Sequence, residues 1–276
     1  MKNILVTGGL GFIGSSLIRK LINNKNLKIL NVDALTYANS SNYQKELIKN
    51  QKNYKFLKLN INNFNRLYKE INIFKPDTVF HLAAESHVDN SIKNSSKFIK
   101  TNIYGTYNLL ESIRILWNGK KVINNHKCKF IHVSTDEVYG FLKLKEKKFT
   151  ELNKYFPSSP YSASKASSDL LVYSWYKTFN LPTIITNCSN NFGPYQHKEK
   201  LIPKVILNCM LNKQIPVYGK GNQIRDWIFV DDHVNTLIQL ARKGLIGESY
   251  NIGNNCEITN LDLIKKIIII LNQIYE

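Results

Sequence analysis

The feature that most constrains this chain is a glycine-rich stretch near its start, between two short apolar runs. Ile4-Leu5-Val6 leads into Gly9-Leu10-Gly11-Phe12-Ile13-Gly14, and a second apolar run covers residues 29–32. Glycine is needed where a backbone turns sharply, where a pyrophosphate approaches closely, and where a helix packs on a strand. A helix beginning near Phe12 would aim its free amide groups at the phosphates. The stretch therefore predicts strand, turn, helix and strand, with a dinucleotide bound at the turn.

An acidic residue at the end of the second apolar run refines this prediction. Asp33 follows Gly14 by 33 − 14 = 19 residues, the spacing at which a carboxylate accepts hydrogen bonds from an adenosine ribose. A carboxylate in that place repels a 2′-phosphate. The sequence therefore favours NAD over NADP.

Strand-like and helix-like segments alternate through the first two thirds of the chain, which is typical of a parallel sheet covered on both faces. The expected strands are 54–60, 78–82, 130–134 and 182–187, and the expected helices are 64–74, 97–117 and 161–178. Beyond them we expect helices at 202–211 and 233–243, strands at 215–218 and 227–230, and an apolar tail at 263–275. The prediction is an α/β fold: a Rossmann-like doubly wound parallel sheet, residues 1–190, with a smaller, partial C-terminal substrate lobe, residues 191–276.

The net charge of +18 allows an anionic partner, but the lysines are scattered and no arginine-rich run with aromatic residues appears. We therefore expect no nucleic-acid partner. No apolar run is long enough to span a bilayer and no secretion signal is visible, so we expect no membrane association. The four cysteines, Cys128, Cys188, Cys209 and Cys256, form no CxxC pair, and we interpret them as buried thiols of a cytoplasmic protein.

Two carboxylates beside two hydroxyls follow the expected strand 130–134. Parallel sheets place their ligand crevice at the carboxyl ends of the strands, where Ser134-Thr135-Asp136-Glu137 would lie. In a crevice, one carboxyl group can stay protonated as an acid while the other is ionised as a base. A helix cap or turn cluster is the alternative interpretation of this segment.

Tyr161 and Lys165 are four residues apart and would share one face of a helix. A free tyrosine, with a pKa of about 10, is a poor base at neutral pH. A neighbouring ammonium and the positive nicotinamide would favour the phenolate. The pair is suited to removing a hydroxyl proton while hydride leaves the same carbon.

His81, Glu85, His87 and Asp89 end another strand at the same sheet edge. Two histidines with two carboxylates suggest zinc, but no third nitrogen or thiolate ligand has a suitable spacing. We prefer a loop that lines the cofactor and substrate, and expect no metal.

With these residues identified, the chain resembles the dTDP-glucose 4,6-dehydratases, members of the extended short-chain dehydrogenase/reductase family. The matching motifs run in order from residue 8 to residue 253 and are GGLGFIGS, VDALTYA, HLAAESHVDNS, TNIYGTYNLLE, HVSTDEVYG, SPYSASKASSD, TNCSNNFGPYQ, EKLIP, PVYGKG, QIRDW and GESYNIG. Epimerases and reductases of this fold share the glycine loop and YxxxK but usually lack the Asp-Glu pair.

The resemblance implies an NAD-dependent lyase that acts on dTDP-glucose in deoxysugar (rhamnose-type) synthesis, as a homodimer. It implies that Tyr161, with Thr135 and Lys165, removes the proton of the 4-hydroxyl. Glu137 would remove the C5 proton and Asp136 would protonate the departing 6-hydroxyl, giving dTDP-4-keto-6-deoxyglucose. The residues implied to bind NAD are Gly8, Gly11, Phe12, Ile13, Gly14, Asp33, Ala34, Leu35, Thr36, Asn60, Ile61, Leu82, Ala83, Ala84, Glu85, Ser86, Thr101, Tyr161, Lys165 and Asn191. Those implied to bind the substrate are Ser86, Thr135, Asn190, Lys200, Leu201, Ile202, Pro203, Lys204, Val205, Pro216, Val217, Tyr218, Arg225 and Asn260.

The chain departs from the family pattern in three places. Asn60 stands where the family usually has aspartate, and Asn90 replaces a usual arginine. Relatives also continue beyond residue 276, so we expect a weakened substrate lobe and exposed apolar surface at 267–271. Two alternatives follow: an NAD-binding relic with impaired catalysis, or a sugar-nucleotide epimerase or decarboxylase of the same fold.

Overall fold

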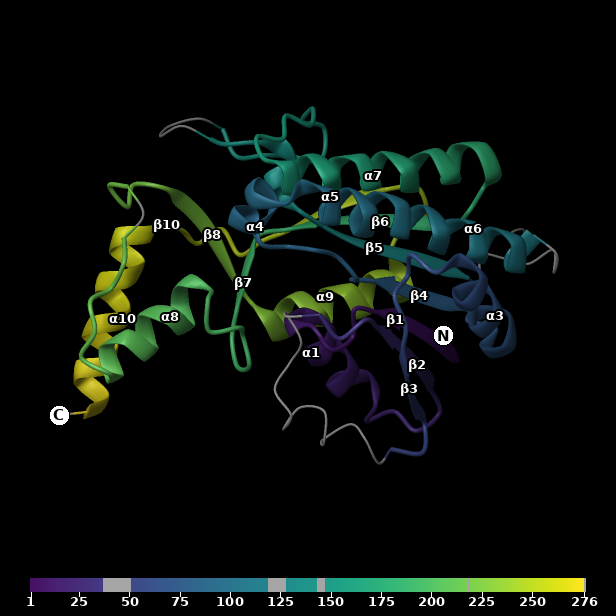
Figure 1. The fold of residues 1–276 in the computed structure, drawn as a ribbon, viewed down its shortest axis with the longest axis horizontal. Coiled ribbons are helices and arrows are strands. Elements are labelled where there is room, and N and C mark those ends of the chain that lie inside the picture. The colour runs from purple at the N-terminus through teal and green to yellow at the C-terminus, as the bar shows by residue number, and fades with distance from the viewer. Residues whose placement is uncertain (37–50, 119–127, 143–146, 218, 276) are drawn as a thin grey trace.

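A parallel sheet forms the centre of the computed structural model, which describes residues 1–36, 51–118, 128–142, 147–217 and 219–275 (Figure 1). Within these residues, seven strands lie in the order β3-β2-β1-β4-β5-β6-β9, and every neighbouring pair is parallel. The strands are β1 (Asn3–Thr7), β2 (Lys28–Asp33), β3 (Tyr54–Lys58), β4 (Thr78–His81), β5 (Lys129–Thr135), β6 (Thr183–Cys188) and β9 (Ser249–Ile252). From β1 the chain adds strands first on one side (β2, β3) and then on the other (β4, β5, β6). This change of side between β1 and β4 creates a crevice at the carboxyl ends of the two strands.

Helices cover both faces of the sheet (Figure 1). One face carries α1 (Phe12–Leu21) and α9 (Val230–Lys243); the other carries α3 (Phe64–Phe74), α6 (Gly105–Asn118) and α7 (Pro160–Phe179). Strand β1 contributes to both cores, because Ile4 and Val6 pack with the first group whereas Leu5 packs with the second. This is the alternation of a strand buried on both sides. The predicted Rossmann-like α/β fold is confirmed.

The second half of the chain divides between this sheet and a smaller assembly. Helix α9 packs on α1, and β9 joins the large sheet beside β6. A second sheet has the order β10-β8-β7. Its strands are β7 (Asn190–Phe192), β8 (Ile224–Phe229) and β10 (Glu257–Thr259), with α8 (Leu201–Met210) and α10 (Asn260–Tyr275) beside them at the C-terminal end (Figure 1).

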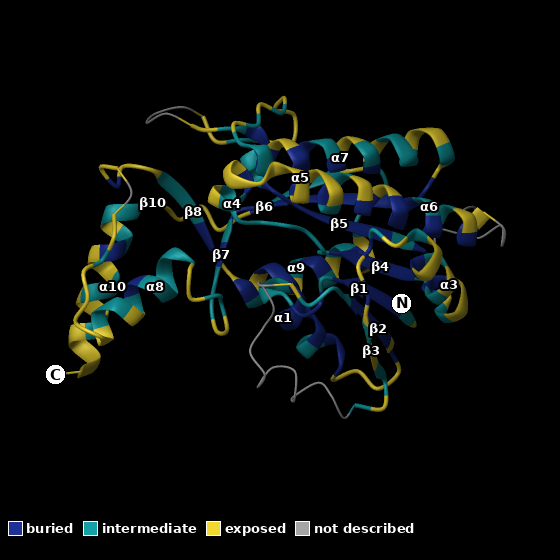
Figure 2. Ribbon diagram, in the orientation of Figure 1, coloured by how far each residue is buried: buried dark blue, intermediate teal, exposed yellow. Residues whose placement is uncertain are grey.

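Helix α10 carries apolar surface, as predicted for 267–271. Ile269 and Ile270 are 56% and 53% exposed. In Figure 2, α10 is mostly yellow and teal, the colours of exposed and intermediate residues, whereas the central strands of the large sheet are mostly dark blue, the colour of buried residues.

Two expectations from the sequence are wrong. Residues 215–217 form no strand, and Pro216 among them lacks the N–H that a ladder requires. The cysteines are free, and Cys128 and Cys188 are buried as expected, but Cys256 is exposed and Cys209 is partly so.

None of the helices in the described part of the chain is both long and apolar enough to cross a membrane.

Candidate active site

A cleft of about 480 Å³ opens at the carboxyl ends of the central strands, beside the glycine turn. The glycine turn and β2 form one end of it. Strand β5, helix α7 and the second sheet form the other end. It therefore lies where an open parallel sheet is expected to bind its ligand.

The glycine turn fits a dinucleotide. Gly8 has φ +72°, and a Cβ there would lie 2.6 Å from the backbone nitrogen of Ala83. Gly14 packs against the carbonyl of Gly8 as α1 passes the strand. Gly11 differs, because a Cβ there would meet only the Gly8 oxygen, at 3.3 Å, and would otherwise point into open space. Gly11 borders the cleft and precedes α1, so a pyrophosphate can reach the helix N-terminus there.

Asp33 ends β2 at the edge of the cleft. Its Oδ2 accepts from the backbone of Leu10 at 2.9 Å, and its Oδ1 accepts from Leu35 at 2.8 Å. The carboxylate thus holds the glycine turn in register with β2, in the place predicted for ribose recognition.

Nearly all residues proposed for the cofactor border this cleft, Asp33 and Asn191 included. Leu35 does not border it; its φ is +56° and its side chain packs with the core on the α1 side. Asn60 borders the cleft next to Ile61, and its Oδ1 accepts from the backbone of Asn62 at 2.9 Å.

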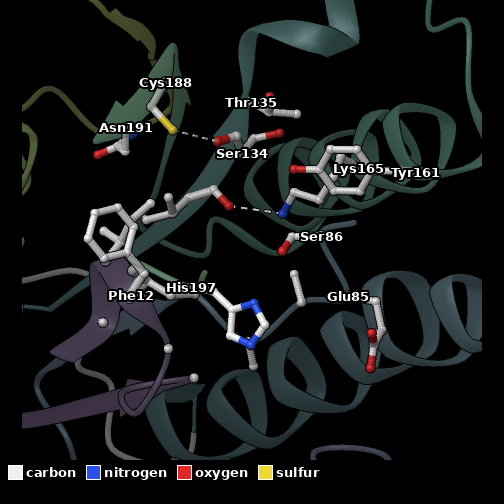
Figure 3. A pocket seen from close by; sticks show the side chains of 18 of the residues that line it. Phe12, Glu85, Ser86, Ser134, Thr135, Tyr161, Lys165, Cys188, Asn191 and His197 are labelled. Atoms are coloured by element: carbon white, nitrogen blue, oxygen red, sulfur yellow. Dashed lines mark hydrogen bonds between the residues drawn. The ribbon is translucent and has the colours of Figure 1, made fainter. Parts of the chain in front are cut away.

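Helix α7 supplies Tyr161 and Lys165. Ser159 and Ser162 form a reciprocal capping box, and Pro160 occupies the first turn, which fixes where the helix begins. Lys165 donates from Nζ to the carbonyl of Val133 on β5 at 2.9 Å. Figure 3 shows the two side chains together, with Ser86 and Thr135 nearby.

The sequence predicted that the Lys165 ammonium, together with the nicotinamide, favours the Tyr161 phenolate, but the surroundings of Tyr161 in the folded chain shift its pKa the other way. Burial raises its pKa well above the ordinary 10.0; Glu137 acts in the same direction and the Thr135 hydrogen bond opposes it. The chain's own groups therefore keep the phenol protonated. The positive nicotinamide ring of bound NAD supplies the charge that favours the phenolate.

Thr135, Asp136 and Glu137 lie where β5 passes into the short helix η3 (Asp136–Tyr139). Thr135 Oγ1 accepts from the backbone of Glu137 and donates to Asp136 Oδ1, both at 3.3 Å. Burial, followed by the charge of Glu137, raises the pKa of Asp136 from 3.8 to about 7. Burial also raises the pKa of Glu137, while Arg225 and Lys200 oppose that rise. The pair thus has the form expected of one proton donor and one base.

The cleft brings Thr135, Glu137, Tyr161 and Lys165 together, whereas Asp136, the residue before Glu137, does not border the cleft. Burial lowers the pKa of Lys200, while Glu137 raises it. Lys200 and Arg225 therefore place positive charge beside the Glu137 carboxylate, at the end of the cleft away from the glycine turn.

The substrate prediction divides into residues inside and outside the cleft. Ser86, Asn190, Lys200, Leu201, Arg225 and Asn260 border it with Thr135. Because α8 begins at Leu201, only this first residue of the helix borders the cleft; residues 202–205 lie outside it, and Val205 is buried. Pro216 and Val217 also lie outside, and Tyr218 is outside the described residues.

Several residues that border the cleft were not predicted. They are Val32, Leu59, Val133, Cys188, Ser189, Gln196, His197 and Trp227. Val32, Val133 and Cys188 lie at or within two residues of the carboxyl ends of their strands, so the rule that ligands lie at carboxyl ends would have found them. Gln196 and His197 lie in an irregular loop, where the sequence gives no such signal. In the described part of the chain, no group of three or more His, Cys, Asp or Glu side chains is arranged to hold a metal ion.

Comparisons with known proteins find relatives that match nearly the whole chain. The family model of GDP-mannose 4,6 dehydratase matches residues 5–275. A dTDP-glucose 4,6-dehydratase of Haemophilus influenzae is 51% identical over 274 residues, which are 99% of this chain and 81% of the relative.

Solved structures give the same result. A Bacillus anthracis dTDP-glucose 4,6-dehydratase in complex with NAD has a TM-score of 0.87 at 42% identity, over 99% of this chain and 81% of that one. A Streptomyces venezuelae dTDP-glucose 4,6-dehydratase with NAD and TYD bound has a TM-score of 0.90 at 37% identity, with the same coverage.

Proposed function

Because this chain belongs to the dTDP-glucose 4,6-dehydratase family, we propose that it converts dTDP-glucose into dTDP-4-keto-6-deoxyglucose with NAD as cofactor. The observation that carries the proposal is the joint position of Tyr161, Lys165, Thr135 and Glu137 around one cleft that begins at the glycine turn. The partly buried Asp136-Glu137 pair favours a dehydratase over an epimerase, since elimination of water needs both an acid and a base.

Each proton transfer is given to a residue at the catalytic end of the cleft or, for Asp136, beside it. When bound, NAD would supply the hydride chemistry, accepting hydride from C4 of the sugar and returning it to C6. Tyr161 removes the 4-hydroxyl proton, with Thr135 hydrogen-bonded to it, and a 4-ketone results. Glu137 takes the C5 proton, which the ketone has made acidic, and Asp136 protonates the departing 6-hydroxyl as water. Glu137 then returns its proton to C5, so the net change is the loss of one water.

Asp136 needs one movement for this role. Its carboxyl now accepts from Thr135 Oγ1 and does not border the cleft. The proposal requires that rotation about its side-chain bonds turn the carboxyl toward the cleft. Its pKa of about 7 leaves it partly protonated at neutral pH, as a proton donor requires.

The division into residues 1–190 for the NAD-binding region and 191–276 for the substrate lobe stays a prediction, in which the two regions interleave. The nucleotide of the substrate would lie at the second sheet. Lys200 and Arg225 are the cations that face the cleft there, and they suit a diphosphate. Asn190 and Asn260 would add neutral hydrogen bonds.

We also propose a cytoplasmic homodimer formed by α6 and α7. Their outer surface exposes Tyr107 (39%) on α6 and Leu170 (61%) and Tyr173 (46%) on α7, and Figure 2 shows solvent-facing positions along both helices. Apolar side chains on adjacent helices of one face suit pairing with the same face of a second copy. The free cysteines fit a reducing compartment.

The direct test is to incubate the purified chain with NAD and dTDP-glucose and to follow the product by mass, as loss of one water. Tyr161→Phe should abolish product formation, whereas Tyr68→Phe, on distant α3, should retain it. A chain that binds NAD but forms no 4-keto product would show that it is a relic instead.

A further inference from the structure

Asp169 is a buried acidic residue near the catalytic end of the cleft, and the mechanism above gives it no part. Asp169 is 1% exposed, follows Lys165 by one helical turn on α7, and does not border the cleft. A buried carboxylate is costly unless it is hydrogen-bonded and balanced by a positive charge. The hydrogen-bond partners and the neighbouring charges of Asp169 therefore indicate its role.

The hydrogen bonds of Asp169 reach three separate elements. Oδ2 accepts from Ser134 Oγ on β5 at 2.8 Å, from the Tyr155 hydroxyl at 3.1 Å, and from Asn187 Nδ2 on β6 at 3.3 Å. Asn187 Nδ2 also donates to the carbonyl of Thr135, at 3.3 Å. One carboxylate thus joins α7 to the ends of the two strands that enter the catalytic end of the cleft.

The balancing charge can be assigned by examining each titratable neighbour. His132 Nε2 lies 3.0 Å from Asp169 Oδ1, but burial and the charge of Lys165 hold its pKa well below 6.5, so the ring is neutral. Tyr155 and Tyr139 have raised pKa values, chiefly through burial, and both stay neutral.

On β6, burial raises the pKa of the Cys188 thiol to about 12, so it also stays neutral. Lys165 is the remaining titratable neighbour in the described cluster. Burial lowers its pKa, and Asp169 is the first of the groups that oppose this. Burial raises the pKa of Asp169 to about 6, with Lys165 opposing, so the carboxylate is ionised above that pH.

We infer that Asp169 is a positioning residue, whose carboxylate is the buried counter-charge of the Lys165 ammonium and ties Thr135 on β5 to the helix that carries Tyr161. This role rests on the proposed function, because it matters to the proton transfer at Tyr161. Lys165 donates to the carbonyl of Val133, the residue before Ser134, so its ammonium and the carboxylate that accepts from Ser134 lie along the same end of β5.

Asp169→Asn tests the inference, since it removes the charge and keeps the size of the side chain. The Ser134 and Tyr155 hydroxyls can rotate to suit the amide. We expect kcat to fall at least about tenfold with the KM for dTDP-glucose within about twofold. The alkaline limb of the kcat profile should move down by about one pH unit, because the ammonium loses its counter-charge.

Tyr155→Phe is the matched control, because it removes one hydrogen bond to the same carboxylate and keeps the charge. It should keep the wild-type alkaline limb. Asp169→Glu, the conservative variant, should keep that limb even if its larger side chain reduces kcat. A shift as large in Tyr155→Phe as in Asp169→Asn would overturn the inference, as would an unchanged limb in Asp169→Asn.

A measurement without substrate separates this inference from the proposed function. In lysine-labelled protein, NMR titration should give a lower Lys165 pKa in Asp169→Asn than in wild type, the signal being assigned by its loss in Lys165→Arg. A wild-type chain without dehydratase activity would refute the function, and the titration would still decide on Asp169. Asp169→Ser is the second charge-removing variant; if neither variant folds in saturating NAD, Asp169 acts in folding and the inference fails.

Discussion

The raised pKa of Asp136 makes a prediction that links catalysis to stability. In the unfolded chain its pKa is the ordinary 3.8, and in the folded chain burial and Glu137 raise it to about 7. Between these values the folded protein holds a proton that the unfolded chain has released. Stability therefore falls as pH rises through this range, and the full cost is present above about pH 7.

The magnitude follows from the same two values. A difference of about three pH units corresponds to about 4 kcal/mol, at 1.36 kcal/mol for each unit. Asp136→Asn removes the ionisation and keeps the shape of the side chain. Relative to wild type, the free energy of unfolding of the variant should rise with pH by about 2–4 kcal/mol between about pH 4 and pH 8.

Urea unfolding at a series of pH values measures this difference, with Asp232→Asn as the control because Asp232 is exposed on α9. The control should stay within about 0.5 kcal/mol of wild type throughout. If the Asp136→Asn difference does not change with pH, the carboxyl group is not destabilised as an ion and its assignment as the acid loses its physical basis. The variant should also lose water elimination, so the gain in stability comes with a loss of function.

Three further predictions concern the base, the cofactor turn and the dimer. Glu137→Gln should stop elimination but allow oxidation at C4, so the near-ultraviolet absorbance of reduced cofactor should accumulate with dTDP-glucose; unchanged product formation would remove Glu137 from its role. Gly11→Ala should weaken NAD binding at least about tenfold, measured by calorimetry, while stability changes by about 1 kcal/mol or less, because the added methyl group faces the cleft and not the core; unaltered affinity would contradict a pyrophosphate at Gly11. Leu170→Arg should give a monomer in sedimentation, since it places a charge on the exposed face of α7, and a variant that stays dimeric would exclude that face.

Local patterns were enough to predict the nucleotide end of the site. The spacing of Gly9, Gly11, Gly14 and Asp33 is a property of a single strand–turn–helix–strand unit. Gly11, Gly14 and Asp33 border the cleft, as does Gly8, whereas Gly9 packs against Asn31 and Ile18. The Tyr161–Lys165 face is likewise a property of one helix. Such features are visible in a sequence because the residues that form them are near neighbours in the chain.

The rest of the site depends on contacts between distant segments. Lys165 meets Val133 across 32 residues, and Asp169 meets Ser134 across 35. Strand β9 was not predicted and finds its place only by pairing with β6.

What the sequence by itself determined is therefore the class of fold and the kinds of chemical group available. Tertiary structure decided their protonation: burial keeps the Tyr161 phenol protonated and brings the pKa of Asp136 to about 7. The physical reason is that a pKa depends on the water excluded and the charges gathered around a group, and both are set by segments far away in the chain.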